Sequence, residues 1–181
     1  PVRGDFFELT KPQAKARLGV DDGRPLIVSF WGSLGSSGMN RVMADFLALE
    51  GAREPFHHVH GVGGICWNDM QGWMRERGFD PAAHPAIEVC EYIYDMAAVM
   101  RAADLVICRA GASTLSELTA LGVPAILVPS PNVTNHHQEK NAALLGDHGA
   151  ALVLPEQEVD GKTLFAAAAG LLRDAPRLAQ M

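Results

Sequence analysis

The chain has 181 residues, of which 48% are hydrophobic and 20% charged, and its formal net charge is −6 at pH 7. These values are typical of one globular domain with a sizeable core. The acidic balance argues against nucleic acid as a partner, because binding a phosphate backbone requires clustered Lys and Arg. No apolar run approaches the length of a membrane span, and no signal peptide is visible. The odd number of cysteines, three, favours a reducing cytoplasm over a disulfide framework.

The first half of the chain alternates between helical and extended patterns. Thr10 is a suitable cap for a helix with Pro12 in its first turn, where the missing N–H does no harm. Further on, apolar residues follow at helical spacing: Met39, Val42, Met43, Phe46 and Leu47. The elements predicted in this half are a helix at residues 10–18, a strand at 26–30, a glycine- and serine-rich turn at 32–38, a helix from Met39, a strand at 56–62 and a helix at 68–77.

The second half repeats the alternation. It predicts a strand at residues 86–92, a helix at 95–102, a strand at 105–108, a helix from near Ser113, a strand at 125–128, a helix from near His136, a strand at 151–154 and a helix at 161–172. Strands that alternate with helices indicate a parallel sheet covered on both faces. The predicted fold class is therefore α/β, a Rossmann-like parallel six-stranded sheet with helices on both faces, in a single domain over residues 1–181.

The loop that follows the fourth strand is the most informative segment. It reads Gly111-Ala112-Ser113-Thr114, all small residues, and it opens a helix. In a parallel sheet such a loop lies at the carboxyl ends of the strands, where open α/β sheets bind ligands. Its backbone N–H groups and the helix N-terminus suit a phosphate. The structural alternative is a capping box, in which Thr114 caps the helix and Glu117 returns to the cap N–H.

Five segments, in their order and spacing, resemble one protein family. They are Pro1-Val2-Arg3, Gly32-Ser33-Leu34-Gly35 with Asn40, Tyr92-Ile93-Tyr94-Asp95-Met96, residues 109–117, and His137-Gln138-Glu139-Lys140-Asn141. The resemblance is to the donor-binding half of the MurG family (glycosyltransferase family 28), and it covers nearly the whole chain. It implies one half of a GT-B enzyme, in which two Rossmann-like domains face each other across a cleft. The N-terminal acceptor domain of such an enzyme is absent here, so we expect a piece of a longer protein.

The family transfers N-acetylglucosamine (GlcNAc) from UDP-GlcNAc to lipid-linked N-acetylmuramyl-pentapeptide, the step from lipid I to lipid II in peptidoglycan synthesis. The resemblance implies that UDP-GlcNAc binds to Arg3, Ser33, Ile93, Ala112, Ser113, Thr114, Leu115, Ser116, Glu117 and Gln138, with Tyr92, Gly111, His137 and Asn141 at the margins of the site.

The implied contacts have chemical reasons. The Glu117 carboxylate would accept hydrogen bonds from both ribose hydroxyls, because a carboxylate only accepts. Uracil would pair with the backbone N–H and C=O of Ile93, and Tyr92 would pack against its ring. The hydroxyls of Ser113 and Thr114 would donate to the diphosphate.

Other positions are open between a binding and a structural role. Arg3 matches a residue that the family places near the nucleotide, although a terminal Arg is usually solvated. Gln138 would offer its amide to the sugar hydroxyls, although a polar helix start explains it equally. Trp31 replaces the first Gly of the family pattern, which predicts less backbone freedom in that turn. Residues 61–64 look like a nucleotide loop, and we interpret them as a turn.

The resemblance implies an inverting hexosyltransferase, peripheral on the inner face of the cell membrane in its full-length form, with this chain alone inactive. No catalytic base is assigned, because the acceptor hydroxyl belongs to the absent domain. No cofactor or metal is predicted, since His136 and His137 are adjacent and point in different directions. Three alternatives stay open: another UDP-sugar transferase, a stand-alone UDP-sugar-binding subunit without activity, and a UDP-sugar epimerase.

Overall fold

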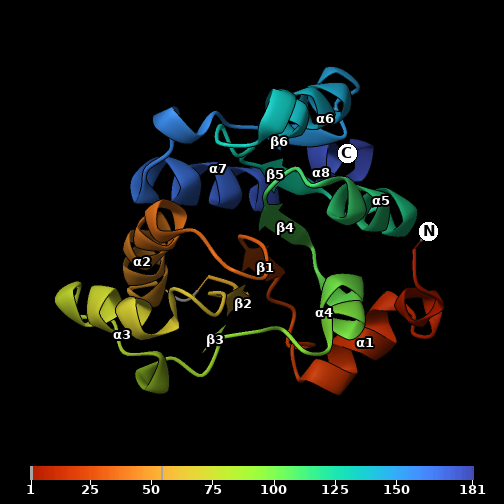
Figure 1. The fold of residues 1–181 in the computed structure, drawn as a ribbon. Coiled ribbons are helices and arrows are strands. Elements are labelled where there is room, and N and C mark those ends of the chain that lie inside the picture. The colour runs from red at the N-terminus through yellow and green to blue at the C-terminus, as the bar shows by residue number, and fades with distance from the viewer. Residues whose placement is uncertain (1, 54) are drawn as a thin grey trace.

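Six parallel strands form one sheet in the order β3-β2-β1-β4-β5-β6 in the computed structural model, which describes residues 2–53 and 55–181 (Figure 1). The strands are β1 Leu26–Phe30, β2 His57–Gly61, β3 Ile87–Cys90, β4 Leu105–Cys108, β5 Ala125–Leu127 and β6 Ala151–Val153. The six predicted strands are confirmed, with β2, β3, β5 and β6 shorter by one or two residues at an end. Pro1, which begins the first family segment, lies outside the described residues.

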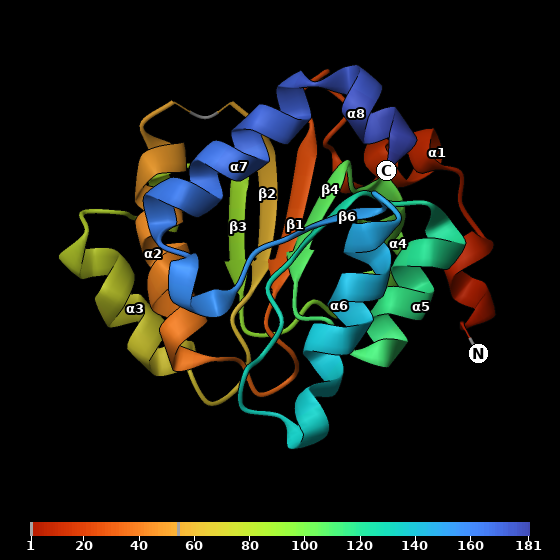
Figure 2. The ribbon, with the colours of Figure 1, turned by 90° about the horizontal axis from the view of Figure 1, so that it is seen from above.

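Helices cover both faces of the sheet, as predicted (Figure 2). One face packs against α1 Lys11–Leu18, α4 Met96–Ala102, α5 Ala112–Leu121 and α6 His137–Asp147. The other face packs against α2 Ser37–Gly51, α3 Trp67–Glu76, α7 Gly161–Arg173 and α8 Ala175–Gln180. Short 3-10 helices lie at Gly4–Phe7 (η1), Pro81–Ala83 (η2), Thr134–His136 (η3) and Glu156–Glu158 (η4). The sheet therefore separates two apolar clusters.

The central strand β1 shows why these residues form a sheet that is buried on both sides. Leu26 and Val28 belong to one apolar cluster, and Ile27 between them belongs to the other. All three are fully buried. A strand with helices on both faces is apolar without interruption, because successive side chains point to opposite faces and both are covered.

The helix α8 was not predicted. Asp174 ends α7, and its carboxylate accepts a hydrogen bond from the N–H of Arg177 at 3.1 Å, so that a new helix begins at once. Pro176 lies in the first turn of this helix, where its missing N–H is tolerated. The same two signals, a capping side chain followed by Pro, correctly predicted α1 at Thr10.

The strand order reverses beside β1. The chain runs outward from β1 through β2 to β3 and then returns to β4 on the other side of β1. Ligands of open α/β sheets bind in the crevice outside the carboxyl ends of the strands at such a reversal. The loops that leave β1 and β4 at this point begin with Trp31 and Arg109. The fold thus brings the predicted glycine turn and the predicted phosphate loop to the same edge.

Candidate functional site

A pocket of about 300 Å³ lies at this edge of the sheet. It is lined by Phe30, Gly32, Ser33, Gly61, Gly63, Glu91, Tyr92, Ile93, Met96, Thr114 and Glu117. These residues come from the ends of β1 and β2, from the loops after β1, β2 and β3, from the first turn of α4 and from the first two turns of α5. Ser33, Ile93 and Glu117, which lie far apart in the sequence, therefore line one cavity. Thr114 and Tyr92 also line it, and the other predicted residues do not.

The helix α5 begins three residues earlier than the capping-box alternative requires. Gly111 occupies the N-cap position, in an extended conformation, and no side chain caps the helix. Thr114 lies inside the first turn, so the capping box of Thr114 with Glu117 is wrong. The exposed Ala112 and Ser113 head this turn, which leaves a helix N-terminus served only by backbone groups and small side chains.

The side chains of two further predicted residues of this helix make their contacts with the protein itself. Leu115 is buried in the apolar cluster that lies beneath α5. The hydroxyl of Ser116 donates to the carbonyl of Ala112 at 2.9 Å, back along the helix. Neither side chain is directed at the pocket, so any contact they make with a ligand would be through the backbone.

Glu117 lies one turn further along α5, half-buried, with its side chain at the pocket. Burial raises the pKa of this carboxyl, the positive charge of Arg3 lowers it, and the negative charge of Asp5 raises it. Arg3 is thus an electrostatic neighbour of Glu117. It forms an ion pair with Asp5 at 3.4 Å and lies over the ring of Phe6, at 5.4 Å from the ring centre.

Tyr92 and Ile93 form the opposite wall of the pocket. Behind them the chain passes through Gly61 and Gly64 without room for side chains. A Cβ atom on Gly61 would lie 3.1 Å from Cγ1 of Ile93, and one on Gly64 would lie 2.1 Å from the Tyr92 hydroxyl oxygen. The turn at residues 61–64 was predicted as a turn without a role, but two of its glycines line the pocket. The glycine density after the second strand was the available signal.

The glycine turn after β1 keeps its geometry despite Trp31. The positions that need a left-handed backbone are Gly32, with φ of 85°, and Gly35, with φ of 84°. Trp31 is not among the non-glycine residues of positive φ, and its side chain is buried. The loss of backbone freedom at position 31 therefore does not disturb the turn, because its first position does not require glycine.

Gln138 and Asn141 connect the first turns of α6 to the loop before α5. The side-chain oxygen of Gln138 accepts hydrogen bonds from the N–H of Ser130 at 2.9 Å and of Ala110 at 3.3 Å. The amide of Asn141 donates to the carbonyl of Ala110 at 3.2 Å. His137 is exposed and contacts only its own turn. The carbonyl end of Gln138 thus has a structural role, while its NH₂ group can still donate to a ligand.

Arg109 lies in one of the family segments, and its contacts hold together the loops at this edge of the sheet. Its guanidinium donates to the carbonyl of Val128, to the hydroxyl of Ser36 and to both oxygens of Glu156, each at 3.2 Å. It also lies 5.9 Å from the ring centre of Trp31. One side chain thus joins the loops after β1, β4 and β5. Its partners are separated in sequence, so no local pattern could reveal them.

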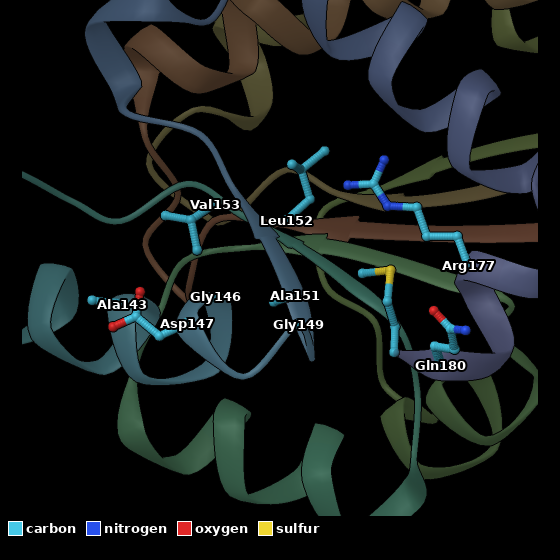
Figure 3. A pocket seen from close by; sticks show the side chains of 10 residues that line it. Ala143, Gly146, Asp147, Gly149, Ala151, Leu152, Val153, Arg177 and Gln180 are labelled. Atoms are coloured by element: carbon cyan, nitrogen blue, oxygen red, sulfur yellow. The ribbon is translucent and has the colours of Figure 1, made fainter.

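A second hollow lies away from this site, at the free edge of β6 (Figure 3). It has a volume of about 500 Å³ and lies between the end of α6, β6 and α8. No predicted site residue lines it. In the part of the chain that the structure describes, no group of three or more His, Cys, Asp and Glu is arranged to hold a metal ion, and every helix is too short or too polar to cross a membrane.

A Rossmann-like parallel sheet with a pocket at its strand reversal is an architecture that nucleotide-binding domains commonly have. A comparison with known protein families identifies the family of this domain. Residues 26–181 match the glycosyltransferase family 28 C-terminal domain, and the chain belongs to that family.

Similar proteins agree with this assignment. The chain is 40% identical over 181 residues to the UDP-N-acetylglucosamine–N-acetylmuramyl-(pentapeptide) pyrophosphoryl-undecaprenol N-acetylglucosamine transferase of Acetivibrio thermocellus, and 38% identical to that of Desulforudis audaxviator. In both cases the match covers 100% of this chain and 48% of the relative. The chain thus spans about half the length of these curated relatives. It is also similar to the crystal structure of Acinetobacter baumannii MurG, with a TM-score of 0.72 and 27% identity, over 99% of this chain and 51% of that one.

Proposed function

We propose that this chain is the donor half of a glycosyltransferase and binds UDP-GlcNAc, whose sugar is transferred to lipid-linked N-acetylmuramyl-pentapeptide. The relatives' names support the reaction. The observation that carries the proposal is the position of Glu117, which lines one pocket with Ser33 and Ile93, one turn beyond an uncapped helix start. A nucleoside diphosphate needs such a combination of an anion site, a ribose acceptor and a wall for the base.

The ligand would lie across the pocket in a defined direction. Its diphosphate would accept hydrogen bonds at the start of α5, where the helix carries about half a positive charge. The ribose hydroxyls would donate to Glu117, and uracil would lie against Ile93 and Tyr92. The sugar would then extend from the diphosphate toward the start of α6, where the NH₂ group of Gln138 can donate to it.

The chemical contribution of this half is electrostatic. As the sugar–phosphate bond breaks, negative charge develops on the departing UDP, and the N–H groups at the start of α5 would stabilise it. The acceptor hydroxyl and the group that removes its proton would come from the other half of the enzyme. We propose that the reaction requires no cofactor and that the whole enzyme works at the inner membrane surface, where its lipid-linked acceptor lies.

Calorimetric titration of this chain tests the proposal. We expect UDP and UDP-GlcNAc to bind with a stoichiometry of about one, and ADP-glucose to bind far more weakly. Absence of binding by both uridine ligands to a folded chain would refute the donor assignment. Equal affinity for several UDP-sugars would leave the donor site in place but favour another UDP-sugar transferase. The epimerase alternative is weaker, because the similar UDP-GlcNAc 2-epimerases share 12% and 16% identity with this chain, which indicates the fold alone.

A further inference from the structure

The turn at residues 61–64, here called the spacer turn, lies between the two walls of the pocket and is bonded to both. The N–H of Gly63 donates to the carbonyl of Glu91 at 2.9 Å, on the side of Tyr92 and Ile93. The N–H of Gly64 donates to the carbonyl of Ser33 at 3.3 Å, on the side of the first glycine turn. The width of the pocket therefore depends on where the spacer turn lies.

The spacer turn also packs closely against the first glycine turn. A Cβ atom on Gly35 would lie 2.3 Å from the carbonyl oxygen of Val62, and one on Gly63 would lie 2.4 Å from the nitrogen of Gly35. Any movement of Val62 would push the first glycine turn, and with it Ser33. There is thus no room for a side chain between the two backbone segments, and segments packed this closely transmit displacement.

Asn40 of α2 is hydrogen-bonded to the spacer turn through its side chain. Its side-chain NH₂ donates to the carbonyl of Val62 at 2.9 Å, and its side-chain oxygen contacts Nε2 of His60 at 2.9 Å. Nδ1 of His60 lies 2.7 Å from the hydroxyl of Ser29. These three side chains are fully buried, so that each hydrogen bond replaces water that cannot enter.

The chain of hydrogen bonds continues into the core. The hydroxyl of Ser29 lies 2.7 Å from Nε2 of His58, whose Nδ1 lies 2.6 Å from a carboxylate oxygen of Glu50. Ser29, His58 and Glu50 have the order of a hydrolytic triad, but at most 1% of each is exposed, so no substrate can reach them. The group is therefore a structural chain that ends at the pocket.

In this network of buried hydrogen bonds, the donor and the acceptor of each bond from Val62 to His58 can be assigned. The carbonyl of Val62 can only accept, so Asn40 presents its NH₂ group there and its oxygen to His60, which must donate from Nε2. Burial, together with the nearby His58, lowers the pKa of His60 to about 3, so its ring is neutral and its one hydrogen is on Nε2. Nδ1 lies 2.7 Å from the Ser29 hydroxyl and 3.1 Å from the Ser29 carbonyl oxygen, and of these two only the hydroxyl can donate to it. The Ser29 hydroxyl has given its one hydrogen, and His58 must donate to it. Each member therefore fixes the orientation of the next.

We propose that Asn40 is a positioning residue for the donor nucleotide, and that the buried chain from Glu50 to Asn40 sets the distance between Ser33 and the Tyr92–Ile93 wall. This inference rests on the proposed binding of UDP. It assigns a role in ligand selection to side chains that no ligand touches.

Three variants test the inference. Asn40→Asp keeps the shape of the side chain but places an oxygen against the carbonyl of Val62. Ser29→Ala removes one buried oxygen and interrupts the chain. Asn68→Asp is the matched control, because it makes the same chemical change at an exposed position of α3 that lies neither in the buried chain nor at the pocket. Folding of each is checked by circular dichroism and thermal melting, and binding is measured well below each melting temperature.

We expect Asn40→Asp to weaken UDP binding about tenfold or more and to reduce the preference for UDP over ADP. Ser29→Ala should weaken UDP binding about threefold to tenfold, and Asn68→Asp should stay within about twofold of wild type. Hydrogen exchange of the amides in the spacer turn should be faster in the first two variants and unchanged in the control. A loss of stability alone would not alter the ratio of UDP to ADP affinity.

Unchanged UDP affinity and base preference in a folded Asn40→Asp variant would overturn the inference. If that variant does not fold, Ser29→Ala decides in the same way. If wild type itself binds no UDP, the proposed function has failed, and hydrogen exchange at the spacer turn still decides whether Asn40 holds it.

Discussion

The side-chain oxygen of Gln138 accepts a hydrogen bond from the backbone N–H of Ser130 at 2.9 Å, which fixes the start of α6 beside the loop after β5. The same oxygen accepts from Ala110, in the loop before α5. The two ends of one amide group therefore serve different purposes. Its oxygen holds the two loops together, and its NH₂ group would donate to the sugar of the proposed donor.

Gln138→Ala is expected to lower both stability and selectivity. Two backbone N–H groups lose their acceptor, which should cost about 1–3 kcal/mol of the free energy of unfolding. The affinity for UDP-GlcNAc should fall more than that for UDP, because only the former carries the sugar. Asn141→Ala is the control, since it also removes a hydrogen bond between α6 and Ala110, in the loop before α5. Denaturant unfolding and calorimetry measure the two effects, and an unchanged ratio of the two affinities would limit Gln138 to its structural role.

Glu117→Ala should weaken UDP binding about ten- to a hundredfold, since a hydrogen bond to a charged group contributes about 1.5–3 kcal/mol. Ser116→Ala is the matched control, because this neighbour is exposed and its hydroxyl bonds within the helix. Titration with 2′-deoxy-UDP separates the causes. The deoxy ligand should bind wild type more weakly than UDP does, and the variant should no longer distinguish the two. Equal UDP affinities of wild type and Glu117→Ala would remove the ribose assignment.

As pH is lowered, the affinity for UDP is expected to begin to fall at a higher pH than it would if Glu117 had the pKa of an ordinary glutamate. The pKa of Glu117 is raised above its usual 4.5, mainly by burial. The ionised form accepts from the ribose hydroxyls, so affinity is full above the raised pKa and is lost as pH falls through it. Calorimetry across mildly acidic pH should show this loss in wild type. In Glu117→Gln the affinity should be lower but flat over the same range, and a parallel fall in both proteins would assign the titration elsewhere.

Base selection should depend on the main chain of residue 93. If uracil pairs with the backbone N–H and C=O of Ile93, ADP and GDP should compete for the pocket far less well than UDP, because a purine is larger and offers a different edge. Ile93→Val should bind UDP within about twofold of wild type, since the contact does not involve the side chain. Competition by ADP as effective as by UDP would refute this pairing.

This chain alone is expected to transfer no sugar. Transfer requires an acceptor oxygen held in line with the sugar–phosphate bond, and such orientation supplies a large share of the rate. The chain corresponds to about half the length of its curated relatives, and we place the acceptor on the other half. Donor binding should therefore persist while product from a lipid-linked acceptor stays undetectable. Turnover by a preparation free of longer enzyme would contradict the division between the halves.

The strands and most helices could be predicted because their signals are local. The run from Leu26 to Phe30 and the run from Leu105 to Cys108 were predicted with the observed ends, since each is a short apolar segment between polar turns. The start of α5 was predicted near Ser113, within one residue of the observed start, but the alternative in which Thr114 caps the helix was wrong, because Gly111 is the N-cap. A local motif competed there with the backbone geometry of the preceding loop.

The parts of the site that were missed depend on contacts between distant residues. His58 and His60 alternate with apolar positions along β2, and nothing in that strand indicates that they would meet Ser29 and Glu50. The role of the spacer turn likewise depends on its closeness to Gly35, and only the folded chain brings these two segments together. Sequence patterns report the period of an element, and the closeness of two elements is decided by packing.

The start of α5 has no side-chain cap, unlike the starts of α1, α2 and α7, which are capped by Thr10, Ser36 and Asp160. A bound diphosphate would supply the missing partner, so the donor would complete the secondary structure of the protein that binds it. Occupancy at about a hundred times the dissociation constant stabilises a protein by about 2.7 kcal/mol. If the donor binds there as proposed, its concentration in the cell would govern the stability of this domain as well as the rate of the reaction.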